Sequence, residues 1–172
     1  MNRIAVACLL TLSAAVSTDV EAMDLSAAGG ATSQGGMTYR LGAGWDWDKS
    51  WWQSSVGRVT GYWSAGYTYW AAGDHGTSAS SLSLAPVLVY EFAGDSIQPY
   101  IEAGIGIAAF SATEAGEQNL GSAFNFEDRI GFGMTFARGQ KVGLRAIHYS
   151  NAGIKEPNDG IESFSLFYQQ PL

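Results

Sequence analysis

Cysteine is almost absent from the sequence, and its position restricts the chemistry. The only cysteine, Cys8, lies in an N-terminal stretch built like a secretory signal peptide. Arg3 supplies the positive start, residues 4–16 form an apolar run, and small residues including Ala22 precede an expected cleavage site. We expect residues 1–22 to be removed, which leaves residues 23–172 as one domain. Without cysteine, that domain has no disulfide, no thiol nucleophile and no cysteine metal site.

Basic residues and long apolar runs are also scarce. The full chain has 9 Lys and Arg against 16 Asp and Glu, a net charge of -7. Removing residues 1–22 takes away Arg3, Asp19 and Glu21, which leaves eight basic and fourteen acidic side chains. An acidic chain without a basic cluster argues against nucleic acid as a partner. No apolar run in the mature part reaches the roughly 20 residues that a membrane helix needs.

Period-two alternation is what the chain has instead. Over about ten residues at a time, large apolar or aromatic side chains occupy one face and small or polar ones the other. Six stretches show this clearly: residues 37–47, 58–69, 81–92, 101–109, 124–136 and 163–172. A weaker stretch near residues 24–32 and another beginning at Val142 bring the number to eight. The pattern predicts an all-β protein, an eight-stranded antiparallel transmembrane β-barrel.

A soluble barrel of lipocalin type is the alternative, with the apolar face turned inward around a ligand. The aromatic residues favour the membrane barrel, because they fall near strand ends as interfacial girdles do. They are Trp45, Trp47, Trp51, Trp52, Trp63, Tyr67, Tyr69 and Trp70. Charged residues that could pair inside a closed barrel fall on the other face: Arg40, Glu91, Glu102, Glu127, Arg129 and Arg145.

The connections between strands can be assigned to two sides of the membrane. With the last strand descending into the periplasm, the predicted extracellular loops are residues 33–36, 72–79, 112–121 and 151–159. The predicted periplasmic connections are residues 48–55, 94–98 and 138–140. The seventh strand then rises, so its upper end lies near the outer leaflet.

Two polar residues at that upper end lie on the apolar face. Val142, Leu144, Ala146, His148 and Ser150 share one parity, while Arg145 points the other way. If the loop at residues 151–159 is symmetric about Lys155, residues whose numbers sum to 310 face each other, which sets Glu162 opposite His148. Directly opposed side chains have Cβ atoms about 5 Å apart. A Ser, a His and a Glu in this order can perform acyl transfer.

Ordinary structural explanations exist for the same residues. His148 and Ser150 could be polar residues at a strand end, and Glu162 a solvated residue at the start of the next strand. Asn158 and Gly160 could reflect only turn chemistry. The outward location nevertheless suggests a lipid substrate. The outer leaflet of the outer membrane is built of lipopolysaccharide, and the acyl chains and sugar backbone of lipid A meet at that height. Phe124, Phe126 and Leu144 would hold the acyl chain, although Phe126 could equally be plain lipid-facing surface.

The run H-Y-S-N-A-G-I-K-E-P-N-D-G-I-E resembles the PagL-type outer-membrane lipid A 3-O-deacylases. The resemblance extends over essentially the whole mature chain, including W-D-W-D-K-S-W-W and Y-E-F-A-G-D-S-I. It implies a triad of His148, Ser150 and Glu162, and an oxyanion hole from the Asn158 side-chain amide and the Gly153 backbone N-H. Asn151 matches a further motif position whose role stays open.

The activity implied by this resemblance is hydrolysis of the 3-O-linked acyl ester of lipid A, with release of a 3-hydroxy fatty acid. The enzyme would be a serine esterase that requires no metal and no cofactor. Its partners would be lipopolysaccharide and outer-membrane lipid. Family members can pair as dimers, so both a monomer and a homodimer stay open. Two other functions remain open: a non-enzymatic outer-membrane barrel serving as adhesin or structural element, and an outer-membrane phospholipase or acyltransferase.

Overall fold

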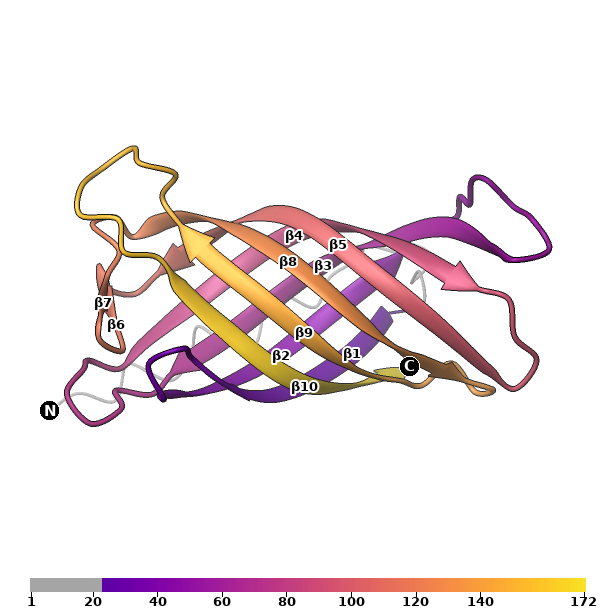
Figure 1. Cartoon of the computed structure of the whole chain (residues 1–172), viewed down its shortest axis with the longest axis horizontal. Helices are drawn as coiled ribbons and strands as arrows, with labels where there is room; N and C mark the ends of the chain where they lie inside the picture. The colour runs from indigo at the N-terminus through magenta and orange to yellow at the C-terminus, as the bar shows by residue number, and fades with distance from the viewer. Residues whose placement is uncertain (1–22) are drawn as a thin grey trace, which may run out of the picture.

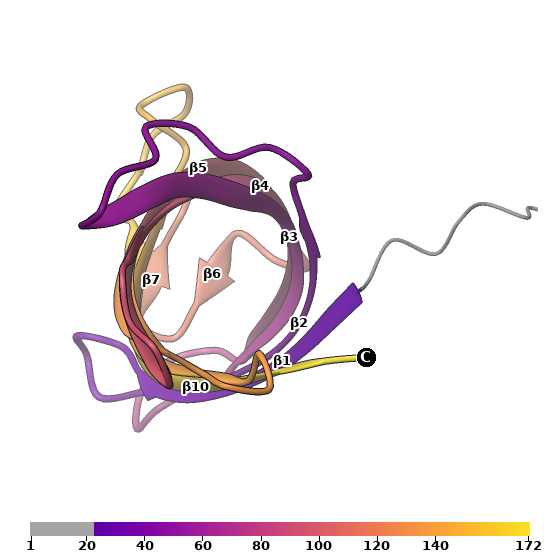
Figure 2. The ribbon, with the colours of Figure 1, turned by 90° about the vertical axis from the view of Figure 1, so that its right-hand side faces the viewer.

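Eight long antiparallel strands form a closed barrel (Figures 1 and 2). The structure, a computed structural model, describes residues 23–172, so the predicted signal peptide lies outside the described residues. Because β1 pairs with both β2 and β10, the sheet has no free edge. The predicted all-β, eight-stranded antiparallel fold is therefore confirmed. The barrel strands are β1 (Met23–Ala31), β2 (Met37–Asp46), β3 (Gly57–Trp70), β4 (Ala79–Phe92), β5 (Ile97–Phe110), β8 (Phe124–Phe136), β9 (Lys141–Ser150) and β10 (Ile161–Pro171).

The two ends of the barrel differ in their connections. One end, the loop end, carries the connections at residues 32–36, 71–78, 111–123 and 151–160. The other end, the terminal end, carries the remaining three connections, the start of β1 and the C-terminus (Figure 1). The loop end matches the side that the sequence predicts to be extracellular. Within residues 23–172, no helix is long and apolar enough to cross a membrane.

Large apolar side chains cover the outside of the barrel. Along each strand they alternate with residues that point into the lumen, many of which are small, polar or charged. Exposed examples from five strands are Leu41, Tyr67, Leu82, Ile105 and Ile130. An outward apolar surface around an interior that contains charged residues is the arrangement of a transmembrane barrel and differs from a lipocalin, whose apolar face points inward.

Glu127 is the centre of a hydrogen-bonded cluster inside the barrel. Its carboxylate pairs with Arg129 of the same strand and lies 3.6 Å from the Arg40 guanidinium. The Tyr149 hydroxyl donates to Glu127 at 2.6 Å, and Arg40 in turn donates to Tyr149 at 3.1 Å. Because Gly66 has no side chain, the Arg40 guanidinium can pack directly over its backbone. These contacts confirm that the charged residues of this group face inward.

A second buried ion pair lies deeper in the lumen. Arg145 donates to Glu102 at 2.6 Å, and the Tyr62 hydroxyl donates to the other oxygen of that carboxylate at 2.8 Å. Glu91, the remaining predicted interior charge, instead pairs with the half-exposed Arg58 near the terminal end. Buried charges of this kind are tolerated because each has a partner of opposite sign.

The lumen at the loop end is filled by apolar side chains. Trp70 is fully buried there and packs against Phe110 and Tyr149 with ring centroids 5.7 and 5.5 Å away. The prediction that Trp70 belongs to the outer aromatic girdle was therefore wrong, since its parity in β3 points it inward. The predicted loop at residues 112–121 also contains two short paired strands, β6 (Glu114–Ala115) and β7 (Gln118–Asn119), which lie within the outline of the ring in Figure 2.

Candidate active site

His148 and Glu162 face each other across two neighbouring strands at the loop end, where β9 ends and β10 begins (Figure 1). The register places them directly opposite, as the symmetric loop predicts. His148 Nδ1 lies 2.8 Å from Glu162 Oε1, and both side chains are partly exposed on the outside of the barrel. A carboxylate in this position fixes the orientation of the imidazole and leaves its Nε2 atom free.

Ser150 follows His148 by two residues and points to the same outer face. Phe126 of β8 is its register partner. The Phe126 ring packs edge-on against the Phe124 ring, with the ring centroids 5.4 Å apart. Within residues 23–172, no hydrogen bond joins Ser150 to His148. Nucleophile and base pairs are often loosely spaced in substrate-free structures.

Gly160 borders the imidazole on the side of the 151–160 connection. It adopts a positive φ of 69°, and a Cβ atom built on it would lie 2.7 Å from His148 Cε1 and 3.4 Å from Nε2. Only a residue without a side chain fits here. The sequence suggested turn chemistry for Gly160, and the structure adds this close approach to the imidazole.

Ser33 orients Glu162 from the other side, a contact that sequence reasoning missed. The Ser33 hydroxyl donates to Glu162 Oε2 at 2.9 Å. Its turn is tied by hydrogen bonds between Thr32 and Gly36. The closure of the barrel is the signal that could have found this contact: Ala31 pairs with Phe164, so extending that ladder by two residues sets Ser33 opposite Glu162.

Asp128 is a second outward polar residue that the alternation analysis left unassigned. It faces His148 from β8, so that Glu162, His148 and Asp128 form one row across three strands, which Ser33 of the 32–36 connection extends through its hydrogen bond to Glu162. A carboxylate on the lipid-facing side of a barrel is energetically unfavourable. Its presence beside an imidazole indicates a polar site rather than plain lipid-facing surface.

Asn151 organises the connection that follows Ser150. Its side chain is completely buried and donates from Nδ2 to the carbonyls of Leu120 and Lys155, both at 2.7 Å. The Lys155 N-H donates back to Asn151 Oδ1 at 3.2 Å. A buried amide with all these partners satisfied stabilises one loop conformation.

Asn158 is held by the same residue. The Asn151 backbone N-H donates to Asn158 Oδ1 at 2.9 Å, which fixes the side-chain amide with its Nδ2 group pointing away from Asn151. Gly153 is exposed with φ of 74°, and it follows Ala152, a non-glycine residue at φ of 54°. Ala152 is therefore a non-glycine residue in the left-handed region close to the end of the strand, and backbone strain of this kind is often found at functional sites.

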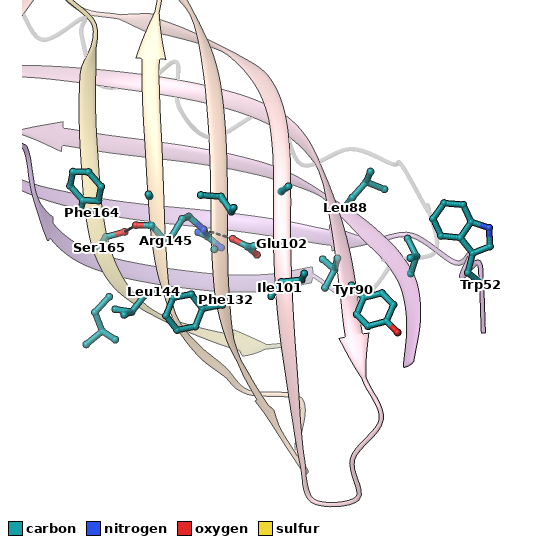
Figure 3. Close-up of a pocket in the computed structure, with 17 residues that line it drawn as sticks. Trp52, Leu88, Tyr90, Ile101, Glu102, Phe132, Leu144, Arg145, Phe164 and Ser165 are labelled. Atoms are coloured by element: carbon teal, nitrogen blue, oxygen red, sulfur yellow. Dashed lines mark hydrogen bonds and ion pairs between the residues drawn. The ribbon is translucent and has the colours of Figure 1, made fainter. Parts of the chain in front are cut away.

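An apolar groove descends from His148 over the outer surface of the barrel. A hollow of about 340 Å³ is lined by His148, Glu162 and Asp128 together with Ala103, Ile130 and Ala146. The last three residues also line a larger hollow of about 850 Å³. Figure 3 shows this larger hollow, where Phe164, Leu144, Phe132, Ile101, Tyr90 and Leu88 follow one another across five strands. The two hollows adjoin on the outer surface of the barrel, because they share Ala103, Ile130 and Ala146.

The fold and this row of side chains define the class of the protein: a closed membrane β-barrel with a polar site on its lipid-facing surface. Within the described residues, no three His, Asp or Glu side chains are grouped so that they could hold a metal ion.

Comparison with known proteins identifies the family. The family model described as Lipid A 3-O-deacylase (PagL) matches residues 33–171. The chain is 69% identical to the lipid A deacylase PagL of Pseudomonas aeruginosa, over 96% of each chain. It is 51% identical to the lipid A deacylase PagL of Bordetella bronchiseptica over 40% of this chain and 39% of that one. A crystal structure of the outer membrane enzyme PagL superposes with a TM-score of 0.85 at 73% identity, covering 87% of this chain and 99% of that chain.

The chain therefore belongs to the PagL family of lipid A 3-O-deacylases. Among the functions that the sequence left open, this assignment favours the deacylase over a structural barrel, a phospholipase or an acyltransferase.

Proposed function

We propose that this protein hydrolyses the 3-O-linked acyl ester of lipid A in the outer leaflet of the outer membrane, with Ser150, His148 and Glu162 as a catalytic triad. The observation that carries the proposal is the 2.8 Å contact of His148 with Glu162 on the outward face, beside Ser150. At the loop end, this site would lie at the height where the acyl chains of lipid A join its sugars. Family membership supports the reaction, and the contact supports these residues.

The first half of the reaction transfers the acyl group to Ser150. With a proton on Nδ1 shared with Glu162, His148 Nε2 takes the proton of the Ser150 hydroxyl as its oxygen attacks the ester carbonyl carbon. Glu162 stabilises the imidazolium that forms. When the bond between the carbonyl carbon and the sugar oxygen breaks, His148 returns the proton to that oxygen, which leaves an acyl-enzyme.

The second half releases the fatty acid. Water attacks the acyl-enzyme while His148 accepts its proton, and the proton then passes to the Ser150 oxygen as the 3-hydroxy fatty acid leaves. Acidity and basicity both come from the imidazole, so we propose a reaction that uses no metal and no cofactor.

Asn158 and Gly153 would stabilise the negative oxygen of both tetrahedral intermediates. The Asn158 Oδ1 atom is occupied by the Asn151 N-H, so that Nδ2 is left to donate elsewhere. The Gly153 N-H lies on an exposed loop and donates to no acceptor within residues 23–172. Prepositioned donors of this kind are worth roughly 10²–10³ in rate each. Asn151 would act as the support that holds both donors.

The groove below His148 would hold the acyl chain. Its walls are apolar and its floor contains Ala103 and Ala146, which leaves room for a hydrocarbon chain beside Ile130. Phe126 lies beside Ser150 and would contact the chain near the ester.

Replacing Ser150 tests the proposal. Ser150→Ala should give lipid A of unchanged mass in cells that lack any other 3-O-deacylase, whereas the unaltered protein should remove one 3-hydroxyacyl chain. Ser78→Ala, at an exposed serine of another loop, is the matched control and should retain activity. Both variants should fold into barrels, as judged by heat-dependent mobility on electrophoresis. Deacylation by Ser150→Ala would exclude Ser150 as the nucleophile.

Cleavage after Ala22 is part of the same proposal, since an outer-membrane protein must first be exported. The intact mass of protein purified from outer membranes should correspond to residues 23–172, and a mass that includes residues 1–22 would contradict it. Pairing into a homodimer stays a prediction.

A further inference from the structure

The 151–160 connection is fastened to a second loop that the reaction does not use. That loop is the connection from β5 to β8, which contains the β6–β7 hairpin. Asn119 of β7 and Asp159 exchange two hydrogen bonds: the Asn119 N-H donates to Asp159 Oδ2 at 3.0 Å, and the Asp159 N-H donates to the Asn119 carbonyl at 3.2 Å. This reciprocal pair joins segments that are forty residues apart in the sequence.

The β6–β7 hairpin is itself a rigid support. Ala115 and Leu120, on either side of the turn, are fully buried in the apolar cluster that closes the lumen. Thr77 and Gly116 exchange two backbone hydrogen bonds of 2.8 Å, which tie the hairpin to the β3–β4 connection. The Asn119 side chain accepts from the Gly121 N-H at 2.9 Å and so fixes the turn that follows. A segment held at this many points moves little.

Two further contacts bring the loops close together. Asn151 Nδ2 donates to the Leu120 carbonyl at 2.7 Å. Gly121, at φ of 64°, lies so near the Pro157 carbonyl that a Cβ atom on it would overlap the carbonyl oxygen. The 151–160 connection therefore contacts the segment that follows the hairpin at two places, at Asn151 and at Pro157.

Asp159 lies in the sequence between two residues that contribute to the geometry of the site. Asn158 precedes it and carries the amide proposed for the oxyanion, and Gly160 follows it against the His148 ring. Asp159 is exposed, so nothing in its own packing explains its position. Its carboxylate is engaged by a backbone N-H of another loop, which is a charge-assisted hydrogen bond.

We propose that Asp159 is a positioning residue: with Asn119 it latches the 151–160 connection to the β6–β7 hairpin and thereby holds the Asn158 amide in place for the oxyanion. The inference rests on the proposed function, because it assigns Asn158 to the oxyanion hole. Misplacing a donor by about 1 Å can cost orders of magnitude in rate, so a single lost contact at Asp159 should be measurable.

The test measures kcat and KM for release of 3-hydroxy fatty acid from lipid A by purified full-length variants in detergent micelles. Asp159→Ala removes the acceptor of the Asn119 N-H and should lower kcat about five- to twentyfold with KM within about twofold. Asp159→Asn keeps a side-chain oxygen acceptor and should restore most of kcat. Asp74→Ala, which removes an exposed carboxylate from the β3–β4 connection, should leave both constants unchanged and so control for charge.

Thermal unfolding separates positioning from a general loss of structure. The hydrogen bond from the Asn119 N-H to Asp159 joins two loops and no barrel strands. The Tm of Asp159→Ala should therefore stay within a few degrees of the unaltered protein. Equal kcat for Asp159→Ala and the unaltered protein would overturn the latch, and so would a fall in kcat that Asp159→Asn shares in full.

A double-mutant cycle with Asn158→Ala shows whether Asp159 acts through Asn158. Asn158→Ala alone should lower kcat about a hundredfold, and adding Asp159→Ala should then cost less than about twofold. If the two losses multiply, the latch does not act through Asn158 and the inference is wrong while the oxyanion assignment stands. If Asn158→Ala leaves kcat unchanged, the oxyanion assignment itself fails, and the inference fails with it.

Discussion

Polar side chains on the inner and outer faces of β9 differ in their burial and in how completely they are hydrogen-bonded. Arg145 and Tyr149 point into the lumen, where each is buried and bonded to a carboxylate of another strand. His148 and Ser150 alternate with them but point outward, where they are partly exposed and retain unused hydrogen-bonding capacity. Polar groups that are fully paired stabilise a structure, whereas groups left free at a substrate's height can react. The same strand therefore carries a structural network on one face and the proposed chemistry on the other.

The largest effect is expected on the outward face. His148→Ala should lower kcat for deacylation by about 10³–10⁴-fold, because Ser150 loses its general base. The free energy of unfolding should change little, since the imidazole is partly exposed. Rates of fatty-acid release and urea unfolding measure the two properties on one sample. Loss of stability equal to that of an inward variant would contradict the separation of roles.

The inward face should show the opposite behaviour. Glu127→Ala leaves Arg129 and Arg40 without their shared carboxylate and should lower the free energy of unfolding by about 3–5 kcal/mol. Glu91→Ala is the matched control, because its partner Arg58 is half exposed and the pair is worth at most about 1 kcal/mol. Folded Glu127→Ala should remain active. Unchanged unfolding in urea would show that the lumen network is not structural.

Gly160 tests how closely the imidazole is positioned. Gly160→Ala should lower kcat about tenfold, because the added Cβ would displace the His148 ring from its present place. Gly73→Ala controls for backbone strain: it has a similar φ of 68°, but its new Cβ would make only an ordinary contact. Equal effects of the two variants on kcat would attribute the loss to strain alone.

Ser33 should have the smallest effect. Ser33→Ala removes one hydrogen bond to Glu162 and leaves the bond between Glu162 and His148 intact. We expect kcat to fall about two- to fivefold, in line with the modest worth of a single exposed hydrogen bond to a charged group. Kinetics of fatty-acid release would detect it, and a loss above a hundredfold would mean that Ser33 has a larger role.

The alternation of apolar and polar side chains in the sequence predicted most of the fold. Side chains project to opposite faces with a period of two, so parity alone placed Arg145 inside and His148 outside. The symmetric loop about Lys155 then set Glu162 opposite His148, as observed. Trp70 shows that residue type alone is not enough. It was assigned to the outer aromatic girdle because it is a tryptophan, but its parity in β3 points it into the core.

The rest of the site depends on contacts that periodicity does not encode. Ser33 reaches Glu162 only because the first and last strands pair. Asp159 meets Asn119 through two irregular connections whose paths are set by the packing of Ala115 and Leu120 in the lumen. Asp128 could have been found from its parity alone, since a charge on the apolar face stands out.

Covalent labelling tests the outward nucleophile most directly. The full-length protein would be treated with a long-chain organophosphonate ester, which reacts with an activated serine, and its peptides would be analysed by mass spectrometry. The account predicts one adduct, on Ser150, that forms far more slowly in His148→Ala. An adduct on another residue, or an unmodified Ser150 in protein that the reagent has inactivated, would contradict it.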